Sequence, residues 1–457
     1  MTWIDELIEI VGPDGLSTGE SVKAQHARDF SYHHGHQPDV VVFPTNARQV
    51  SRIMQVAYRY QIPVIAYGQG TGVEGHTIPL QSGITIDFAN MNRVVAVRPE
   101  DFVVQVEPGI TRQALNKILG PYGLFFPVDP GADASLGGMA STNAAGTEAL
   151  RYGAMRQHVL GLEVVLADGR VMRLGGPTMK SSAGYQLTSL FVGAEGTLGI
   201  LTELTLKVYE IPQLTVAARA VFNTIEDAGE AATEMIMHGV AANRLELMDE
   251  QTIHAVNVVE GTEFPEQPTL FLELAGNHHN ALLEDLETCR SVASDHGTSD
   301  WTVEWDVDRR QALWHARHKA ALDILAASGG SHPFTTDTAV PLSALPRALR
   351  HARETLNRMG IQGAVLGHVG DGNYHIVMGI NPEDPHQLDQ ARAVNEAVIR
   401  YAWEQGGTCT GEHGIGMGKT RFLREERGES SALYWLIKDA LDPHNLLNPG
   451  KTIPLRD

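Results

Sequence analysis

Residues 127–153 read PVDPGADASLGGMASTNAAGTEALRYG, a stretch crowded with Gly, Ala, Ser and Thr and almost without bulky side chains. Small residues over such a length let a rigid ligand lie against the backbone, while Ser135, Ser141 and Asn143 offer short hydrogen-bonding groups. The alternative is a mobile surface loop, although loops this apolar rarely remain in water. The stretch therefore predicts a surface for a large ligand.

A second glycine-rich segment lies earlier in the chain. The apolar residues 63–67 predict a strand, which leads into GQGTG at 68–72. Three glycines let the backbone turn its N–H groups toward an anion such as a phosphate without obstruction by a Cβ. A Rossmann dinucleotide fold would continue with a helix, but VEGHTIPL at 73–80 contains Gly75 and Pro79 and cannot form a regular one. By itself the loop fits an ordinary glycine turn as well as a phosphate site.

Other patterns outline the remaining elements. A strand is expected at 39–44, after which Thr45 caps an amphipathic helix. The sequence LEVVLADG followed by VMRL at 171–174 predicts a hairpin, and residues 190–209 predict a glycine-interrupted strand pair that ends the first domain. From about residue 212 the sequence alternates between strands and helices, as in an α+β layer. These elements are expected as strands at 215–222 and 269–274 and as helices at 225–238, 280–296 and 433–442.

Composition excludes several classes of protein. The formal net charge is −20, and the sequence contains no cluster of basic residues. Both features argue against nucleic-acid partners. Only two cysteines, Cys289 and Cys409, are present, so a reducing compartment and a cytoplasmic location are expected. The N-terminus predicts a short amphipathic helix and no signal peptide. No apolar run reaches about eighteen residues, so no membrane span is expected, while peripheral contact with the inner face of the cell membrane stays open.

The second half contains a candidate metal hairpin. Residues 364–380 read AVLGHVGDGNYHIVMGI, two apolar strands around Asp371-Gly372, a dipeptide preferred in tight hairpins. Counting outward from this turn makes His368 and His375 cross-strand neighbours. Directly opposed Cβ atoms lie about 4.5 to 5.5 Å apart, so two imidazoles could meet one cation at metal–nitrogen distances of about 2.1 Å.

A third ligand is expected from GTCTGEHGIGMGK at 407–419. The adjacent Glu412 and His413 are expected to point in different directions, so that one binds metal while the other faces a substrate. Two histidines and one glutamate with open positions form a catalytic arrangement, and zinc, manganese and iron(II) all suit it. The alternative is a pair of buried strand histidines and a solvated turn.

Four motifs in order resemble the FAD domain of the vanillyl-alcohol oxidase superfamily: GQGTG, PVDP…GGMASTNAAGT…RYG, LEVVLADG and FVGAEGTLGI. The resemblance implies an α+β protein with an FAD-binding domain at 1–211, an α/β substrate cap at 212–400 and a short helical segment at 401–457 that returns to the FAD domain. It implies noncovalent FAD, because residues 68–75 contain no His for covalent attachment. The implied FAD contacts are Gly68, Gln69, Gly70, Thr71, Gly72, Pro130, Ser135, Gly138, Ser141, Asn143, Tyr152, Glu195, Ile200 and Asn448.

GHVGDGNYH followed by GEHGIG resembles the D-2-hydroxy-acid dehydrogenase branch of the same superfamily. This likeness assigns one divalent metal to His368, His375 and Glu412, the role of catalytic base to His413, and the substrate carboxylate to Arg317, whose guanidinium suits a bidentate clamp. Together with TTDTAVPLSALP, these motifs look most like the cytochrome-type D-lactate dehydrogenases. The implied reaction oxidises D-lactate to pyruvate by hydride transfer to flavin N5. The electron acceptor would be a cytochrome, a quinone or an electron-transfer flavoprotein.

The size of the substrate follows from two departures within that family. Relatives that handle 2-hydroxyglutarate resemble one another in a lysine before an Asp, where this sequence has Thr336 before Asp337, and in an Asn where Val377 stands here. A second carboxylate would therefore be buried unpaired, at considerable cost, and a short apolar side chain is favoured. The alternatives are a dehydrogenase of glycolate, of D-2-hydroxyglutarate or of longer D-2-hydroxy acids, a noncatalytic flavin-binding electron-transfer subunit, and a metal hydrolase. The sequence leaves the oligomeric state undetermined.

Overall fold

A computed structural model describes residues 2–456, which form two compact units. The first unit comprises Met1–Ala145, Gly153–Ile211 and Glu412–Asp457, and its two terminal residues, Met1 and Asp457, lie outside the described part. The second unit comprises Gly146–Tyr152 and Pro212–Gly411. The segment 146–152, expected in the FAD domain, thus belongs to the second unit, and that unit extends to Gly411 instead of ending at residue 400.

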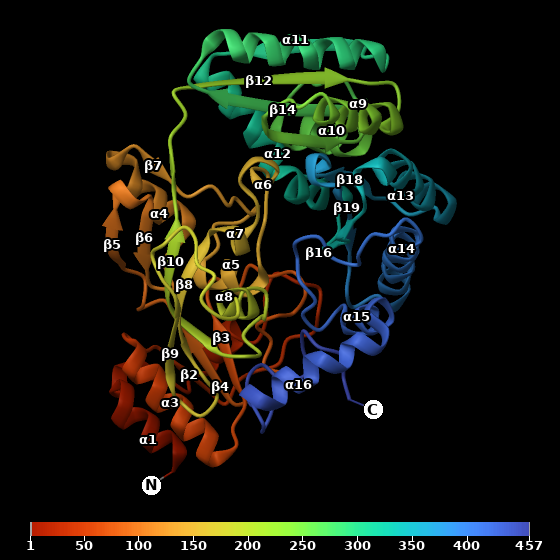
Figure 1. Ribbon diagram of the computed structural model, residues 1–457. Coiled ribbons are helices and arrows are strands. Elements are labelled where there is room, and N and C mark those ends of the chain that lie inside the picture. The colour runs from red at the N-terminus through yellow and green to blue at the C-terminus, as the bar shows by residue number, and fades with distance from the viewer. Residues whose placement is uncertain (1, 457) are drawn as a thin grey trace. The chain divides into compact units, whose positions relative to one another are not determined.

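The first unit contains three sheets, with strand orders β1-β2-β4-β3, β5-β6-β10-β8-β9 and β11-β7. Its strands are β1 (Leu16–Ser17), β2 (Val40–Val42), β3 (Val64–Tyr67), β4 (Ile84–Asp87), β5 (Val94–Arg98), β6 (Val103–Val106), β7 (Leu124–Phe125), β8 (Val159–Val165), β9 (Val171–Gly175), β10 (Ile200–Lys207) and β11 (Tyr209–Glu210). Its helices are α1 (Trp3–Val11), α2 (Glu20–Gln25), α3 (Ala47–Tyr60), α4 (Arg112–Leu119), α5 (Leu136–Thr142), α7 (Met155–His158), α8 (Leu187–Phe191), α15 (Thr420–Arg427) and α16 (Ala432–Leu441). Figure 1 shows their course from the red N-terminus.

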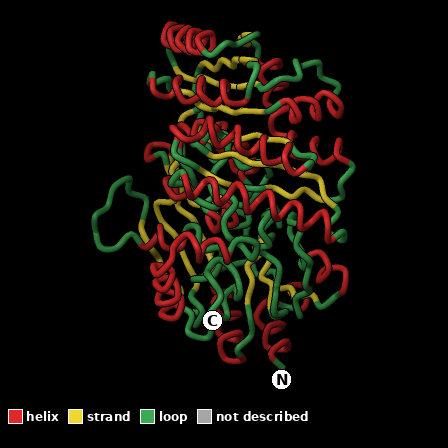
Figure 2. Tube along the Cα trace, turned by 90° about the vertical axis from the view of Figure 1, so that its right-hand side faces the viewer, coloured by secondary structure: helices red, strands yellow, loops and turns green. Residues whose placement is uncertain are grey.

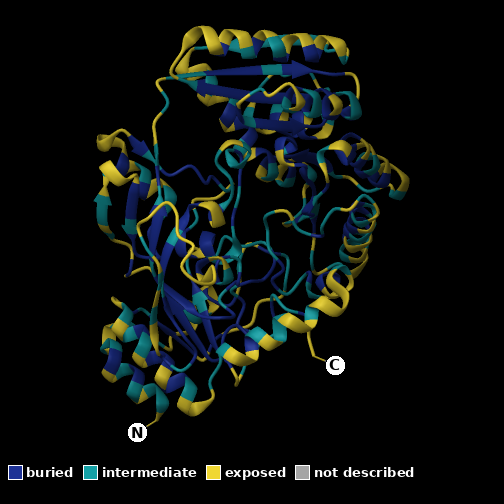
Figure 3. Cartoon of the chain, in the orientation of Figure 1, coloured by how far each residue is buried: buried dark blue, intermediate teal, exposed yellow. Residues whose placement is uncertain are grey.

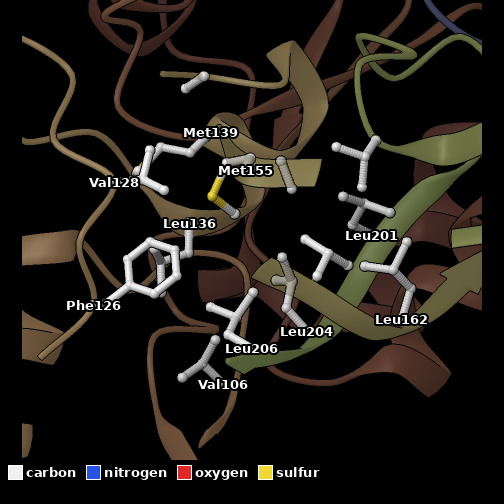
Figure 4. Packing of buried hydrophobic residues seen from close by; sticks show 14 of the residues in the cluster. Val106, Phe126, Val128, Leu136, Met139, Met155, Leu162, Leu201, Leu204 and Leu206 are labelled. Atoms are coloured by element: carbon white, nitrogen blue, oxygen red, sulfur yellow. The ribbon is translucent and has the colours of Figure 1, made fainter. Parts of the chain in front are cut away.

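Two apolar cores hold this unit together. One packs the parallel strands β2, β3 and β4 against α3. The other lies between β6, β8, β10 and α5, and Figure 4 shows its side chains from Val106 and Phe126 to Leu206 in close packing. The interior strands are buried along their length, as the dark blue of Figure 3 shows.

Two local expectations in the first unit are wrong. The N-cap of α3 is Asn46 and not Thr45, because it is the Asn46 side chain that accepts from Gln49 N. The Thr45 hydroxyl instead donates to the Gln49 side chain. Residues 190–207 form the end of α8, a turn and the single strand β10, which pairs with both β6 and β8, and Tyr209 begins the separate short strand β11. Positive φ angles at Gly193, Glu195 and Gly196 fold the GAEGT segment into a turn where a second strand was expected.

The second unit is built on one eight-stranded sheet with the order β15-β12-β14-β13-β18-β19-β16 and with β17 paired to β19. Its strands are β12 (Leu214–Val221), β13 (Ala242–Met248), β14 (Thr269–Gly276), β15 (Asp300–Glu304), β16 (His332–Thr335), β17 (Thr338–Ala339), β18 (Ala364–Gly367) and β19 (Asn373–Ile380). Its helices are α6 (Ala149–Tyr152), α9 (Ile225–Met237), α10 (Glu250–Glu260), α11 (His279–Asp295), α12 (Val307–Ser328), α13 (Leu345–Met359) and α14 (Pro385–Glu404).

Helices cover both faces of this sheet. Helix α9 packs against α11 and α13, and α10 packs against α12, and both groups contact strands of the sheet. Figure 2 shows the yellow strands between red helices. The core under α10 and α12 includes Met248, Phe271, Trp314, Leu366 and Val377. No helix within residues 2–456 is long and apolar enough to cross a membrane.

Candidate functional site

The two hairpin histidines lie close together, although the predicted register is wrong. His375 pairs with Leu366, not with His368, because residues 369–371 form a 3-10 turn that Gly372 closes with a φ of 73°. Side chains alternate along a strand with period two, so a shift of two residues leaves both histidines on the same face. Their ring centroids are 5.5 Å apart, and each offers a nitrogen within 4.8 Å of the other's.

Both imidazoles are oriented through Nδ1. His368 Nδ1 lies 2.7 Å from Glu246 Oε1, and His375 Nδ1 lies 3.1 Å from the Thr336 carbonyl oxygen. Since these acceptors take the Nδ1 proton, Nε2 is the nitrogen with which each ring would bind a cation. A histidine that donates its other N–H to a carboxylate or carbonyl is typical of metal ligands. The pair therefore fits a metal.

Glu246 on β13 joins this pair to the expected substrate residue. Its side chain is only 1% exposed, and its Oε2 forms an ion pair with Arg317 Nη2 at 2.6 Å. Burial acts to raise the pKa of Glu246, but the charges of His368 and Arg317 outweigh burial and hold the pKa below its usual value. Arg317 lies on α12 and is itself buried, and its Nε has no hydrogen-bond partner within residues 2–456. A bound carboxylate would supply that partner.

A second buried carboxylate, Asp337, anchors the segment that leads to Glu412. Asp337 Oδ2 accepts from Gly411 N at 2.9 Å and from the Thr410 hydroxyl at 2.7 Å. Its Oδ1 lies 3.7 Å from His375 Nδ1. A Cβ at Gly411 would stand 2.2 Å from the Asn373 side-chain nitrogen and would displace that amide from its hydrogen bonds to Asp337 Oδ1 and the Thr338 carbonyl. The residue directly before Glu412 is thus fixed beside the partner of His375.

Glu246 and the anchoring role of Asp337 were not predicted from the sequence. Glu246 stands in the apolar run of β13 at a position that faces the interior, and a charged residue in such a place is a signal for a paired site. The sequence distinguishes Asp337 only through Thr336, which stands before it in place of a lysine. The partners of both carboxylates lie far along the chain, His368 being 122 residues from Glu246.

In the first unit, Glu412 and His413 follow on a glycine-rich loop. Glu412 Oε1 and His413 Nε2 are 3.9 Å apart, so the two side chains converge, contrary to the expectation that they point apart. The loop turns at Gly414 with a φ of 80°, so its side chains do not alternate as in a strand. Ile415 N and Gly416 N then donate to Glu195 at 2.7 and 2.8 Å.

Glu195, an expected FAD contact, is occupied by these bonds within the first unit. Its carboxylate also accepts from the Thr452 hydroxyl at 2.8 Å, and its backbone carbonyl accepts from Asn448 Nδ2 at 2.8 Å. Burial acts to raise the pKa of Glu195, but the charge of His76 and these hydrogen bonds hold it below its usual value. Both Glu195 and Asn448 therefore connect the returning C-terminal segment to the first unit.

The expected FAD loops meet within the first unit. GQGTG follows β3, and a Cβ at Gly68 would lie 2.2 Å from Ser135 Oγ, so loop and helix approach as closely as glycine allows. Gly70 has a φ of 65°, which a side chain would strain. The backbone and small side chains that converge here suit a flat ligand with a phosphate group.

The remaining expected FAD residues have the following places. Gln69 and Thr71 lie between the glycines, Pro130 lies on the loop before α5, Ser135 caps α5, Gly138 and Ser141 lie on α5, Asn143 ends it with a φ of 53°, and Ile200 begins β10. Tyr152 differs from the rest, because it ends α6 in the second unit. Its expected contact with FAD stays a prediction, as do the others.

Two regions of the chain match models of known protein families. Residues 211–452 match the model described as "FAD linked oxidases, C-terminal domain", and residues 38–175 match the one described as "FAD binding domain". The chain belongs to the FAD-linked oxidase family. These matches confirm the predicted family and the presence of an FAD-binding domain.

Two curated relatives and one solved structure are informative. The chain is 42% identical to "Probable D-lactate dehydrogenase, mitochondrial" of Danio rerio over 98% of this chain and 90% of the relative. It is 39% identical to "D-lactate dehydrogenase (cytochrome), mitochondrial" of Arabidopsis thaliana, over 96% and 78%. p-Cresol methylhydroxylase with substrate bound has a TM-score of 0.83 at 16% identity, over 100% of this chain and 97% of that chain. This structural likeness shows the fold alone and confirms the predicted α+β fold class.

The expected cytoplasmic location is wrong by the same comparison, because the relatives from Danio rerio and Arabidopsis thaliana are both named mitochondrial. The inference rested on the small number of cysteines, which reports a reducing environment and does not identify the organelle. The expectation of contact with the inner face of the cell membrane falls with it.

Proposed function

We propose that the protein oxidises D-lactate, or a similarly small D-2-hydroxy acid, to the corresponding 2-oxo acid with noncovalent FAD and one divalent metal. The names of the relatives from Danio rerio and Arabidopsis thaliana support D-lactate as the substrate. The observation that carries the proposal is Glu246, which bonds both His368 and Arg317 in a buried position. A metal ligand and a carboxylate-binding residue are thereby linked through one side chain.

The proposed metal ligands are His368, His375 and Glu412. Nδ1 of each histidine donates to an acceptor, and Gly411 N donates to Asp337 Oδ2 at 2.9 Å. When bound, a divalent metal with this ligand set would act as a Lewis acid and lower the pKa of a substrate hydroxyl. Glu246 and Asp337 keep the histidines in place for it.

The proposed roles of the other residues follow from their hydrogen-bonding capacity. Arg317 binds the substrate carboxylate through its guanidinium, whose charge is fixed at every working pH. His413 takes the proton of the C2 hydroxyl as general base, a task for which imidazole titrates in the useful range. When bound, FAD supplies the acceptor for the C2 hydride.

Two uncharged residues of the second unit, Thr336 and Val377, support a short substrate side chain. Thr336 is fully buried, its carbonyl accepts from His375, and its hydroxyl accepts from Ile376 N at 2.9 Å. Val377 is buried in the apolar core under α12. Neither position offers a charge to a second carboxylate, so 2-hydroxyglutarate is expected to be a poor substrate.

Turnover of purified holoenzyme with a substrate panel tests this proposal. We expect D-lactate to be oxidised much faster than L-lactate or D-2-hydroxyglutarate, with glycolate as the comparison for side-chain length. Cytochrome c, a quinone analogue and an electron-transfer flavoprotein, supplied separately, would identify the class of acceptor. Faster oxidation of glycolate or D-2-hydroxyglutarate would contradict the assigned substrate, and no oxidation of any of them would contradict the function.

A further inference from the structure

The second unit contains a cavity of about 430 Å³ that the proposed reaction does not use. It lies between the first turns of α12 and the strands β12, β13 and β14, and its lining includes Thr215, Arg244, Arg310, Gln311 and Trp314. Small-molecule sites commonly have volumes of about 300 to 1,000 Å³. The cavity is therefore large enough for a small organic ligand.

Two hydrogen-bond donors at this cavity are buried without a partner. Trp314 is only 6% exposed, and its Nε1 has no partner among the described residues. The Nε of Arg310 is also buried and has no hydrogen-bond partner among the described residues. Arg310 and Trp314 are one helical turn apart on α12, so both donors come from one face of the helix. Buried donors are normally satisfied, and two at one cavity indicate a missing acceptor.

The charges around the cavity favour an anion. Arg244 is balanced by Glu148 and by Glu273, the latter at 3.7 Å. Arg310 makes no ion pair within residues 2–456, whereas its neighbour Arg309 lies 3.7 Å from Glu304. The cavity also borders the N-terminal turn of the 22-residue helix α12, where the helix dipole favours negative charge.

We propose that this cavity binds a small carboxylate at a site separate from Arg317. The carboxylate oxygens accept from the Arg310 guanidinium and from Trp314 Nε1, while the apolar part of the ligand packs on Val307, which also borders the cavity. Arg317 lies seven residues after Arg310 on α12, which corresponds to about 10 Å along the helix axis. Its guanidinium bonds Glu246, a carboxylate outside the cavity lining.

Succinate tests the proposal because it is a carboxylate without the hydroxyl group that the reaction needs. The indole N–H signals of ¹⁵N-tryptophan-labelled holoenzyme are followed during titration, and the Trp314 signal is assigned by its absence in Trp314→Phe. We expect the Trp314 signal to shift and to saturate, and we expect Arg310→Met to weaken binding about tenfold or more, the value of a charged hydrogen bond. Turnover of D-lactate should stay unchanged in Arg310→Met.

Two controls make the outcome decisive. Arg309→Met removes the same charge from the neighbouring, exposed residue and should leave succinate binding unchanged. Arg317→Met should leave the Trp314 shift in place, and if that variant does not fold, the proposed metal is removed instead with 1,10-phenanthroline, an uncharged chelator that does not compete for a carboxylate site. A missing Trp314 shift, equal binding by the Arg309 and Arg310 variants, or a shift that disappears with Arg317→Met or with 1,10-phenanthroline would overturn the proposal.

Discussion

The two units build their proposed ligand surfaces from different parts of the chain. In the first, the expected FAD surface consists of backbone and small side chains, and Gly68 packs so closely on Ser135 that a Cβ would be 2.2 Å from its hydroxyl oxygen. In the second, buried ionisable side chains hold one another, with Glu246 between His368 and Arg317. The surface of the first unit depends on how closely backbone segments can approach each other and the ligand. The surface of the second unit depends on each buried charge having a partner.

Removal of the metal should give the largest effect, and it should affect the two proposed ligand surfaces differently. We expect turnover of D-lactate to fall to background after treatment with a chelator, because the proposed metal is held by side chains of the second unit and Glu412. The flavin absorbance should remain, since the expected FAD contacts are mainly backbone groups of the first unit. Absorbance and turnover are measured before and after gel filtration, with metal added back as the control. Release of the flavin together with the metal would contradict this division.

His413→Asn should give the next largest effect. Loss of a general base lowers kcat by about a hundredfold to ten-thousandfold, while FAD content and metal content should stay unchanged. Steady-state kinetics and cofactor analysis measure these quantities. His36→Asn, at an exposed position of the first unit, is the matched control and should behave as wild type. Unchanged kcat in His413→Asn would exclude this residue as the base.

Glu246→Gln tests the dependence on pairing in the second unit. The variant leaves Arg317 buried without its counter-charge and His368 with a weaker acceptor, so metal affinity should fall about ten- to a hundredfold. Metal titration of the apoprotein measures this change. Glu226→Gln, which breaks the partly exposed pair with Arg350, is the control and should leave metal affinity unchanged. Equal metal affinities of the Glu246 and Glu226 variants would show that Glu246 does not orient His368 for metal binding.

Gly68→Ala tests closeness of approach in the first unit and should have the smallest effect. The added Cβ would clash with Ser135 Oγ, and the resulting strain should weaken FAD binding roughly tenfold, or about 1.4 kcal/mol. Flavin fluorescence during reconstitution measures this affinity. Gly120→Ala, where a Cβ meets no atom within 4 Å, is the matched control. If both variants bind FAD equally, the loop does not hold the cofactor by close approach.

The same contrast explains what the sequence could predict. The GQGTG loop and the small-residue segment around Ser135 are contiguous, so their character is visible without knowledge of the fold. His368 and His375 were placed on one face in spite of a register error, because a shift of two residues preserves the face. Glu246 could not be predicted as their partner, because the pairing of β13 with β18 is a long-range feature.

Errors in local structure also have physical causes. The expected strand pair at 190–209 became a turn and a strand because Glu195 adopts a φ of 50°, which is uncommon for a residue with a side chain. Its buried bonds to Ile415 and Gly416, more than 200 residues away, support this conformation. Propensity along the chain contains no information about such bonds.

Anaerobic absorbance of the metal-loaded protein, before and after addition of D-lactate and with L-lactate as control, tests the central claim most directly. The proposed function predicts that D-lactate alone bleaches a yellow chromophore, since hydride transfer to bound FAD reduces it. Yellow protein that neither D-lactate nor another D-2-hydroxy acid bleaches would contradict the catalytic function, and equal bleaching by L-lactate would contradict its stereochemistry.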